Sequence, residues 1–441
     1  MHHELNPADG QLAYDLDRAH VFHSWSAQAS LDPLVIAGGL GSEVWDFDGN
    51  RYLDFSSQLV NTNLGHQHPA IVAAIKAQAD VLATVAPSHA NLARGEAAKR
   101  ILGRAGSPFG KVFFTNGGAD AIENAIRMAR LTTGRDKVLS TYRSYHGNTG
   151  AAIVATGDWR RIPNEFARGH VHFFGPFPYR SEFWSDSPEQ ETERALHHLE
   201  RVIVSEGASS IAAILLETVP GTAGVIVPPP GYLEGVRALC DKYDILWIAD
   251  EVMCGFGRTG SWFAWQQFGA TPDLITFAKG VNSGYVPIGG VAISESIAHA
   301  FDQQVFPGGL TYSGHPLAAG SIVGALDAME AEGTIEHAAM IGADHLAPGL
   351  AELADKHPMI GEVRGLGVFW ALDLVSDRET RMPVSASIVL ELKKALMARG
   401  LLPFQAENRI HVVPPCNVST DDVARALAIY DEAFTAVEAA L

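Results

Sequence analysis

The sequence predicts an α/β protein with a mostly parallel central sheet, joined to a smaller α+β domain. Between about residues 110 and 295, short apolar runs alternate with helical stretches, the order of a parallel sheet covered by helices. After residue 316 the pattern changes to a strand pair, a helix, a strand and a last helix. The length of 441 residues also exceeds what one hydrophobic core usually supports.

The N-terminal part predicts a hairpin followed by a helix. EVWDFDGNRYLDF (43–55) reads as two strands that turn at Asp48-Gly49. AIVAAIKAQADVL (70–82) has the apolar spacing of a helix, and Pro69 suits an early helical position.

The central part predicts buried strands that alternate with helices. Continuous apolar runs bounded by helices are typical of parallel strands buried on both faces. We expect strands at 111–115, 137–141, 211–217, 245–250, 273–278 and 289–294. We expect helices at 119–134, 231–244 and 317–333.

The C-terminal part predicts a strand pair within 362–375, a helix at 387–400, a strand at 409–414 and a last helix after Ser419. Ser419 and Asp422 have the spacing of a capping box. We expect residues 1–65 to join residues 321–441 in the small domain, because the α/β block of residues 66–320 separates them.

Composition limits the function classes. The net charge of −18 argues against nucleic-acid and anionic-membrane partners. Three scattered cysteines without a CxxC motif indicate a reducing compartment. The N-terminus lacks a signal-peptide pattern, and no run of about 18 apolar residues appears. These features predict a cytoplasmic enzyme outside the membrane.

Chemically active residues follow the ends of the predicted strands. Gly117 and Gly118 end one strand and open a helix, whose free N–H groups suit a phosphate. Glu217, Asp250 and Lys279 each follow a buried apolar run. Ligands of open α/β sheets bind at this edge, and buried charges are costly unless they are paired or functional.

Each feature also has a structural explanation, and two further motifs compete. A glycine pair can be only a tight turn, and a lysine at a strand end can reach solvent. GFGRTG (255–260) matches a dinucleotide motif, but neither a helix nor a strand-ending acid follows at the required distance. GHQH (65–68) lacks a third metal ligand with recognisable spacing, so we expect no metal.

Several ordered segments resemble the class III aminotransferases, which depend on pyridoxal phosphate and share the aspartate-aminotransferase fold (fold type I). The resemblance covers residues 20–435. The segments are FFTNGGADAIENAIRMAR, SYHG, LLETVPGTAGVIVPPPGY, LWIADEVMCGFGRTG, LITFAKGVNSGYVPIGG and TYSGHPLAAG.

The resemblance implies a role for each matching residue. Lys279 would hold the cofactor as a Schiff base, and Asp250 would pair with its ring nitrogen. Val252 and Tyr145 would pack on opposite faces of the ring, with His146 beside Tyr145 in the same motif and Glu217 near the cofactor hydroxyl or the substrate. The phosphate would contact Gly117, Gly118 and Ala119, and Thr311 from a neighbouring subunit, so we expect a homodimer or a higher homo-oligomer. The family often has serine in this glycine turn, which this chain lacks.

Pyridoxal phosphate acts as an electron sink, which requires a deprotonated amine at Lys279 and a charged partner for the ring nitrogen at Asp250. The predicted reaction is ping-pong transfer of an amino group from an amine or ω-amino acid to an α-keto acid, with pyruvate favoured. Trp25 and Val60 are expected to line the substrate pocket. Arg409 either binds a keto-acid carboxylate or forms a surface ion pair with Glu407.

Three alternatives stay open at this point. One is a 4-aminobutyrate, ornithine or diamine transaminase that uses 2-oxoglutarate. Another is an aminomutase or racemase, which would turn over without an acceptor. The last is a silent protein of the same fold, which the joint presence of Lys279, Asp250 and Tyr145 disfavours.

Overall fold

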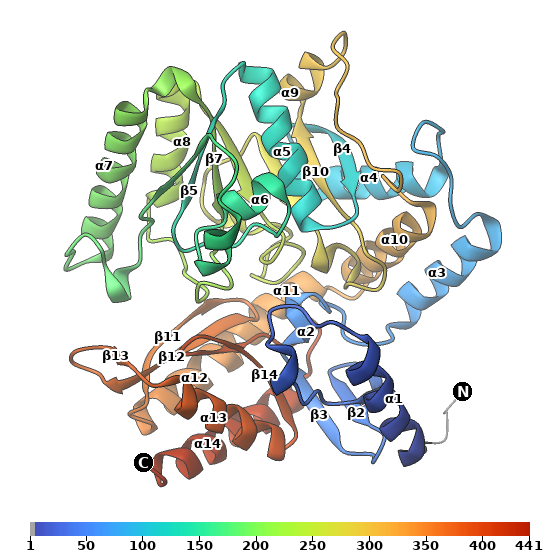
Figure 1. The fold of residues 1–441 in the computed structure, drawn as a ribbon, viewed down its shortest axis with the longest axis vertical. Coiled ribbons are helices and arrows are strands. Elements are labelled where there is room, and N and C mark those ends of the chain that lie inside the picture. The colour runs from blue at the N-terminus through green and yellow to red at the C-terminus, as the bar shows by residue number, and fades with distance from the viewer. Residues whose placement is uncertain (1–4) are drawn as a thin grey trace.

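The computed structural model describes residues 5–441, which form two sheets with helices packed on them. One sheet with its helices occupies the upper half of Figure 1, and the other occupies the lower half. No helix among the described residues is both long and apolar enough to cross a membrane.

The upper sheet has seven strands in the order β4-β10-β9-β8-β7-β5-β6. Its strands from β9 to β6 are parallel, and β10 runs antiparallel to both β4 and β9. Every strand except β10 therefore ends at the same edge. The strands are β4 (Phe109–Thr115), β5 (Lys137–Thr141), β6 (His170–Phe173), β7 (Ile211–Glu217), β8 (Leu246–Asp250), β9 (Leu274–Phe277) and β10 (Gly289–Ser294).

Helices cover both faces of this sheet because its strands are apolar on both sides. In β7, Ala213 and Leu215 belong to the same apolar cluster as α5, whereas Ile214 and Leu216 belong to the cluster of α7 and α8. The helices of this half are α3 (Pro69–Val81), α4 (Leu92–Ala105), α5 (Gly118–Thr133), α6 (Gly150–Ala155), α7 (Pro188–Glu206), α8 (Tyr232–Tyr243), α9 (Glu295–Ala300) and α10 (Pro316–Ala331).

The lower sheet combines both ends of the chain. Its order is β1-β2-β3-β14-β15-β12-β11, with β13 on β12. β3 pairs in parallel with β14, and Leu53 lies opposite Leu401. The strands are β1 (Ile36–Leu40), β2 (Glu43–Asp46), β3 (Arg51–Phe55), β11 (Ile360–Leu366), β12 (Phe369–Asp377), β13 (Met382–Pro383), β14 (Leu401–Ala406) and β15 (Arg409–Val412).

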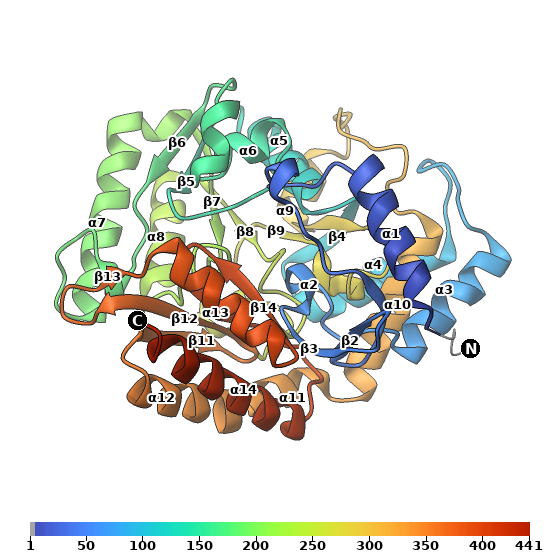
Figure 2. The same cartoon turned by 60° about the horizontal axis from the view of Figure 1, so that its bottom comes forward.

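The helices of the lower half pack on this sheet and on each other. Figure 2 shows α13 and α14 side by side in front of it, with α1 near β2. They are α1 (Pro7–His20), α2 (Ser57–Val60), α11 (Thr334–Met340), α12 (Ala347–Lys356), α13 (Ala386–Ala398) and α14 (Thr420–Glu438), with a π-helical turn at Ile341–Leu346.

The structure confirms the predicted α/β class, the hairpin at Gly49 and the helix after Pro69. The Asp422 N–H donates to the Ser419 hydroxyl at 3.1 Å, which caps α14. The helices α1 and α4 were not expected from the sequence. The exact domain boundaries at residues 65 and 320 stay a prediction.

Candidate active site

The functional residues expected from the sequence gather where the strands of the upper sheet end. Glu217 and Asp250 lie opposite each other in the last register position of β7 and β8. Asp250 also pairs with Thr276 of β9, three residues before Lys279. This register brings two carboxylates and a lysine to one edge.

Asp250 is held by neighbours on both of its oxygens. Its Oδ2 lies 2.7 Å from the Nδ1 of His146, and its Oδ1 accepts a hydrogen bond from the Val252 N–H at 3.0 Å. The exposed fraction of Asp250 is 3%, and that of His146 is also 3%. The Nε2 of His146 is buried and has no partner in the described chain. The hydroxyl of Thr276 also donates to Oδ1, at 3.4 Å. These bonds orient the Asp250 carboxylate, while the Nε2 of His146 has no partner among the described residues.

Glu217 links two segments that border the site. Its Oε1 accepts from the N–H of Tyr145, and its Oε2 accepts from the N–H of Gly221, each at 2.8 Å. Burial raises the pKa of Glu217 to about 7, and the Asp250 charge adds to this increase against the opposing effect of His146. Glu217 therefore changes its protonation near neutral pH.

Lys279 begins a 3₁₀ turn, Lys279–Asn282, directly after β9. Its φ of +47° lies in the left-handed region, a costly conformation for a residue with a side chain and one that is concentrated at functional sites. Burial lowers the pKa of the Lys279 amine, although Asp250 and Glu217 oppose this effect. A lowered pKa favours the free amine, which is the form needed for covalent attachment.

A glycine turn stands at the start of α5, facing the Tyr145 segment. Gly117 precedes the helix and its first turn has no side-chain cap, so free N–H groups and the positive end of the helix dipole are available there. A Cβ on Gly118 would lie 2.8 Å from the Cγ1 of Val252. A Cβ on Gly147 would lie 2.5 Å from the Cβ of Ala119. The chain thus approaches too closely at both glycines for larger residues.

A cavity of about 660 Å³ opens beside Lys279. Tyr145 and Trp25 form part of its wall and meet edge to face, with ring centroids 6.5 Å apart. Its other lining residues include Leu59, Arg143, Asp158, Arg160, Phe177, Thr222, Met253, Phe404, Glu407 and Arg409. A cavity of this size suits a small ligand.

The predicted substrate residues fall into two groups. Trp25 and Arg409 both line the cavity. Arg409 is buried and also pairs with Glu407, at 2.6 Å. The two roles considered for Arg409 are therefore compatible, because it lines the cavity and forms the ion pair at the same time. Val60 is different, because it is 1% exposed and packs in an apolar cluster with Val219 and Phe369.

The prediction that Val60 faces the substrate is therefore corrected to its neighbour Leu59. Gln58 and Val60 both have positive φ angles of 58°, which turn the chain so that Leu59 lines the cavity instead. No glycine marks this turn in the sequence, and such a turn reverses which side chain faces inward.

Arg160 is a candidate that the sequence did not reveal. Its guanidinium lies 3.7 Å from the centroid of the Tyr145 ring and 5.9 Å from that of Trp25, and its Nε bonds Asp158 at 3.1 Å. The charge of Arg160 contributes to lowering the pKa of Lys279. The only signal in the sequence is the segment DWRR after Gly157, which has no recognisable motif.

Thr311 is exposed and is not among the residues that line the cavity of its own chain. The contact of Thr311 with a neighbouring subunit stays a prediction.

The residues of this edge fit pyridoxal phosphate. The unpartnered Nε2 of His146 beside Asp250, the uncapped start of α5 and the amine of Lys279 provide the kinds of groups that such a cofactor needs. Asp250 would face the ring nitrogen, Gly117 to Ala119 would hold the phosphate, and Lys279 would bind covalently.

Comparison with known proteins gives the same family over almost the whole chain. The family model described as aminotransferase class-III matches residues 26–434. The chain is 32% identical to the taurine–pyruvate aminotransferase of Bilophila wadsworthia, covering 96% of this chain and 97% of that protein. It is 37% identical to the putrescine–pyruvate aminotransferase of Pseudomonas aeruginosa, covering 79% and 78%.

Solved structures agree with this result. The structure of taurine:2-oxoglutarate aminotransferase from Bifidobacterium kashiwanohense, with pyridoxal phosphate and glutamate, matches with a TM-score of 0.94 at 43% identity and covers 98% of each chain. A pyridoxal-phosphate-bound amine transaminase from an uncultivated Pseudomonas species matches with a TM-score of 0.91 at 35% identity and covers 95% and 98%. The chain belongs to the class III aminotransferases and is a transaminase that depends on pyridoxal phosphate.

Proposed function

We propose that this transaminase takes the amino group from a short amine or ω-amino acid, including aminosulfonates, and transfers it to an α-keto acid, with pyruvate favoured. The observation that carries the proposal is a cavity lined by Lys279 together with four arginines, Arg143, Arg160, Arg180 and Arg409. The names of the taurine–pyruvate and putrescine–pyruvate relatives support it.

We assign the proton transfers to Lys279. Bound pyridoxal phosphate supplies the electron sink for the electrons released at the donor carbon. The Nζ of Lys279 takes the proton from that carbon and later returns it, as general base and then general acid. Burial favours the unprotonated amine for the first of these tasks, because it lowers the pKa of Lys279.

Asp250 keeps a proton on the ring nitrogen. Its carboxylate is oriented by His146 and by the Val252 N–H, so little reorganisation is needed when charge develops. Tyr145 and Val252 are proposed to hold the ring between them, and Glu217 is proposed to contact the cofactor hydroxyl or the substrate.

Two of these arginines, Arg160 and Arg409, are proposed to recognise the acidic groups of the two substrates. Arg160 stacks on Tyr145 and is paired with Asp158, which makes it the candidate for the sulfonate or carboxylate of the donor. Arg409 is the candidate for the carboxylate of the keto acid. Arg160 is paired with Asp158, and Arg409 is paired with Glu407. The side chain of Glu407 is 65% exposed, so the carboxylate of an incoming keto acid can displace it from Arg409.

A second candidate acceptor is 2-oxoglutarate. The observation that favours it is the 43% identity with a taurine:2-oxoglutarate aminotransferase over 98% of the chain. This acceptor has a second carboxylate, which requires a second cation in the cavity.

A donor and acceptor panel tests the proposal. Taurine, β-alanine, 4-aminobutyrate, putrescine and a neutral amine are each paired with pyruvate and with 2-oxoglutarate, and kcat/KM is measured for every pair. We expect anionic short donors with pyruvate to give the highest values. The substrate proposal fails if neutral amines exceed the anionic donors, and the acceptor proposal fails if 2-oxoglutarate exceeds pyruvate. Arg409→Ala with both acceptors then tests Arg409, since an unchanged KM for both removes it from the site.

We further propose that the enzyme works in the cytoplasm as a homodimer or a higher oligomer, with Thr311 reaching the cofactor phosphate of the neighbouring subunit. The three cysteines are free and buried, which suits a reducing compartment. Sedimentation analysis of the wild type and of Thr311→Ala, together with the cofactor content of each, tests the oligomeric state and this contact.

A further inference from the structure

The turn that brings Leu59 to the large cavity has a strained backbone. Ser57, Gln58 and Val60 have φ angles of 43°, 58° and 58°, and none of them is glycine. A residue with a side chain keeps such an angle only where the surrounding structure enforces it. Leu59 lines the cavity beside Lys279 and is 50% exposed. The packing of Leu59 itself is therefore too slight to enforce the turn.

The two ends of the turn are anchored in the protein interior. The hydroxyl of Ser57 donates to the carbonyl of Val413 at 2.6 Å. Val60 is 1% exposed and packs in an apolar cluster. These contacts fix where the turn begins and ends. They leave Gln58 and Leu59 between them, and the backbone angles of Gln58 then decide where the Leu59 side chain lies.

The carboxylate of Asp54 holds the middle of the turn. Its Oδ2 accepts a hydrogen bond from the Nε2 of Gln58 at 2.8 Å, and the Gln58 N–H donates to both oxygens, at 3.2 and 3.3 Å. The Ser56 hydroxyl donates to Oδ1 at 2.6 Å, and the Nε2 of His66 lies 2.8 Å from Oδ2. Asp54 is fully buried. Burial acts to raise the pKa of its carboxyl, but the hydrogen bonds from His66, Ser56 and Gln58 bring that pKa below its ordinary value.

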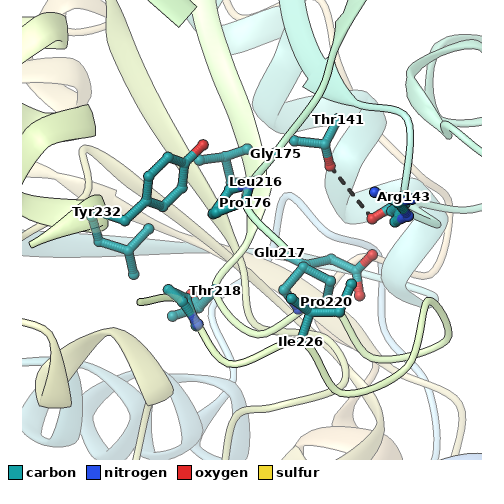
Figure 3. Close-up of a pocket in the computed structure, with 12 residues that line it drawn as sticks. Thr141, Arg143, Gly175, Pro176, Leu216, Glu217, Thr218, Pro220, Ile226 and Tyr232 are labelled. Atoms are coloured by element: carbon teal, nitrogen blue, oxygen red, sulfur yellow. Dashed lines mark hydrogen bonds between the residues drawn. The ribbon is translucent and has the colours of Figure 1, made fainter. Parts of the chain in front are cut away.

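We propose that Asp54 is a positioning residue for donor selectivity, because its carboxylate holds Gln58 in the left-handed conformation that places Leu59 in the cavity wall. Asp54 does not line that cavity, so it acts on the substrate through Leu59. Figure 3 shows a smaller cavity beside Glu217, and none of residues 54–60 lines it. The inference rests on the proposed substrate cavity, but it concerns the bulk of the donor and not its charge.

A double-mutant cycle between Asp54→Asn and Leu59→Ala tests this role. Asparagine replaces one acceptor oxygen of Asp54 with a donor, which cannot bond the Gln58 N–H or its Nε2. For each holoenzyme, kcat/KM is measured for two donors of equal charge that differ by a phenyl group. The pairs are β-alanine with 3-amino-3-phenylpropionate, and isopropylamine with 1-phenylethylamine. The pair and the acceptor that the wild type turns over faster are used, so the result does not depend on the proposed donor charge or acceptor.

We expect each single variant to shift the ratio of kcat/KM toward the bulky donor by about 10-fold, because the cavity wall loses a leucine side chain. In the Leu59→Ala background, Asp54→Asn should add no further shift, since no leucine remains to be displaced. An unchanged ratio in Asp54→Asn would overturn the proposal. Equal shifts by Asp54→Asn in both backgrounds would also overturn it, because Asp54 would then act independently of Leu59.

Asp46→Asn is the matched control. Asp46 is also buried and also holds a turn, because its Oδ1 accepts the N–H groups of Asp48 at 3.0 Å and Asn50 at 2.9 Å. None of these three residues lines the large cavity. We expect Asp46→Asn to lower the urea midpoint, as Asp54→Asn does, and to leave the donor ratio unchanged. The same shift of the ratio in Asp46→Asn would show general loosening of the fold and contradict a positioning role for Asp54.

A second pair of variants keeps Asp54 in place, so the test does not depend on whether Asp54→Asn folds. Gln58→Ala removes the side-chain bond to Asp54 but keeps a Cβ and its strain. Gln58→Gly removes the same bond together with the strain, because glycine adopts a positive φ readily. We expect Gln58→Ala to shift the ratio toward the bulky donor, and Gln58→Gly to shift it less. An unchanged ratio in both variants, or a larger shift in Gln58→Gly, would contradict the proposed role of Asp54.

Discussion

The two ends of the active-site cleft are built in different ways. At the cofactor end, formed by His146, Glu217 and Asp250, every exposed fraction is 7% or less, and backbone N–H groups or neighbouring side chains bond the carboxylates. At the substrate end, formed by Trp25, Leu59, Arg160 and Arg409, Trp25 is 57% exposed and Leu59 is 50% exposed. There the arginines pair with Asp158 and Glu407.

This difference in burial suggests that the cofactor end carries out the chemistry, whereas the substrate end selects the donor and acceptor. Groups that stabilise developing charge must be oriented before the reaction, and strand ends on a buried sheet give that rigidity. At the substrate end, Trp25 and Leu59 are half exposed, and Arg160 and Arg409 are paired with Asp158 and Glu407, carboxylates that an anionic substrate can replace. We therefore expect changes at the cofactor end to reduce turnover for all donors, and changes at the substrate end to depend on the donor.

The largest effect is expected for Lys279→Ala. Removing the amine removes both covalent attachment and the proton shuttle, so turnover should fall by about 10⁴-fold or more. Borohydride treatment followed by mass spectrometry should find no cofactor on the variant chain. Lys242→Ala is the control, because Lys242 is exposed and pairs with Glu200. Cofactor trapped on the Lys279→Ala chain would refute the assignment.

Asp250→Asn is expected to have the next largest effect. Asparagine keeps most of the shape but loses the charge that holds a proton on the ring nitrogen, so kcat should fall by about 10²–10³-fold for every donor. Asp241→Asn, at an exposed residue paired with Arg237, should leave kcat unchanged. A reduction that affects only some donors would show that Asp250 belongs to the substrate end.

Arg160→Ala should separate the donors. Losing a charge-assisted hydrogen bond of about 1.5–3 kcal/mol should raise the KM of anionic donors roughly 10–100-fold, while the KM of a neutral amine changes little. Arg161→Ala is a matched control one residue away, because Arg161 pairs with Glu165 and does not line the cavity. Equal changes for anionic and neutral donors would count against anion recognition by Arg160.

The smallest predicted effect concerns pH and Glu217. The pKa of its carboxyl is raised from 4.5 to about 7 in the folded protein, mainly by burial. The folded state therefore binds more protons than the unfolded state between these pH values. Its contribution to stability falls as pH rises from about 5 to 7, by up to about 3 kcal/mol.

Glu217→Gln cannot titrate, so its unfolding free energy should depend less steeply on pH in this window. Urea unfolding of the wild type and the variant at pH 5, 6, 7 and 8 measures the two slopes. Identical slopes would show that Glu217 is not perturbed.

The sequence predicted the cofactor end because its residues directly follow apolar strands. Asp250 and Lys279 are placed by where a buried run stops, which is visible in the order of residues alone. The hairpin around Gly49 and the helix after Pro69 were predictable for the same reason, since local rules decide them.

The substrate end was less predictable because it depends on turns and long-range packing. Val60 was expected in the pocket, but positive φ angles at residues without glycine bring Leu59 there instead. Arg160 reaches the cavity only because its segment folds over Tyr145, a contact that no spacing in the sequence reveals. The direction of β10, antiparallel to both β4 and β9, likewise depends on the whole sheet.

The most direct test is a crystal structure of this protein with pyridoxal phosphate bound. We expect the Asp250 carboxylate within about 3 Å of the ring nitrogen and the Lys279 Nζ covalently bonded at the opposite end of the ring. A ring nitrogen that faces another residue, or a cofactor joined to a lysine other than Lys279, would contradict the proposed site.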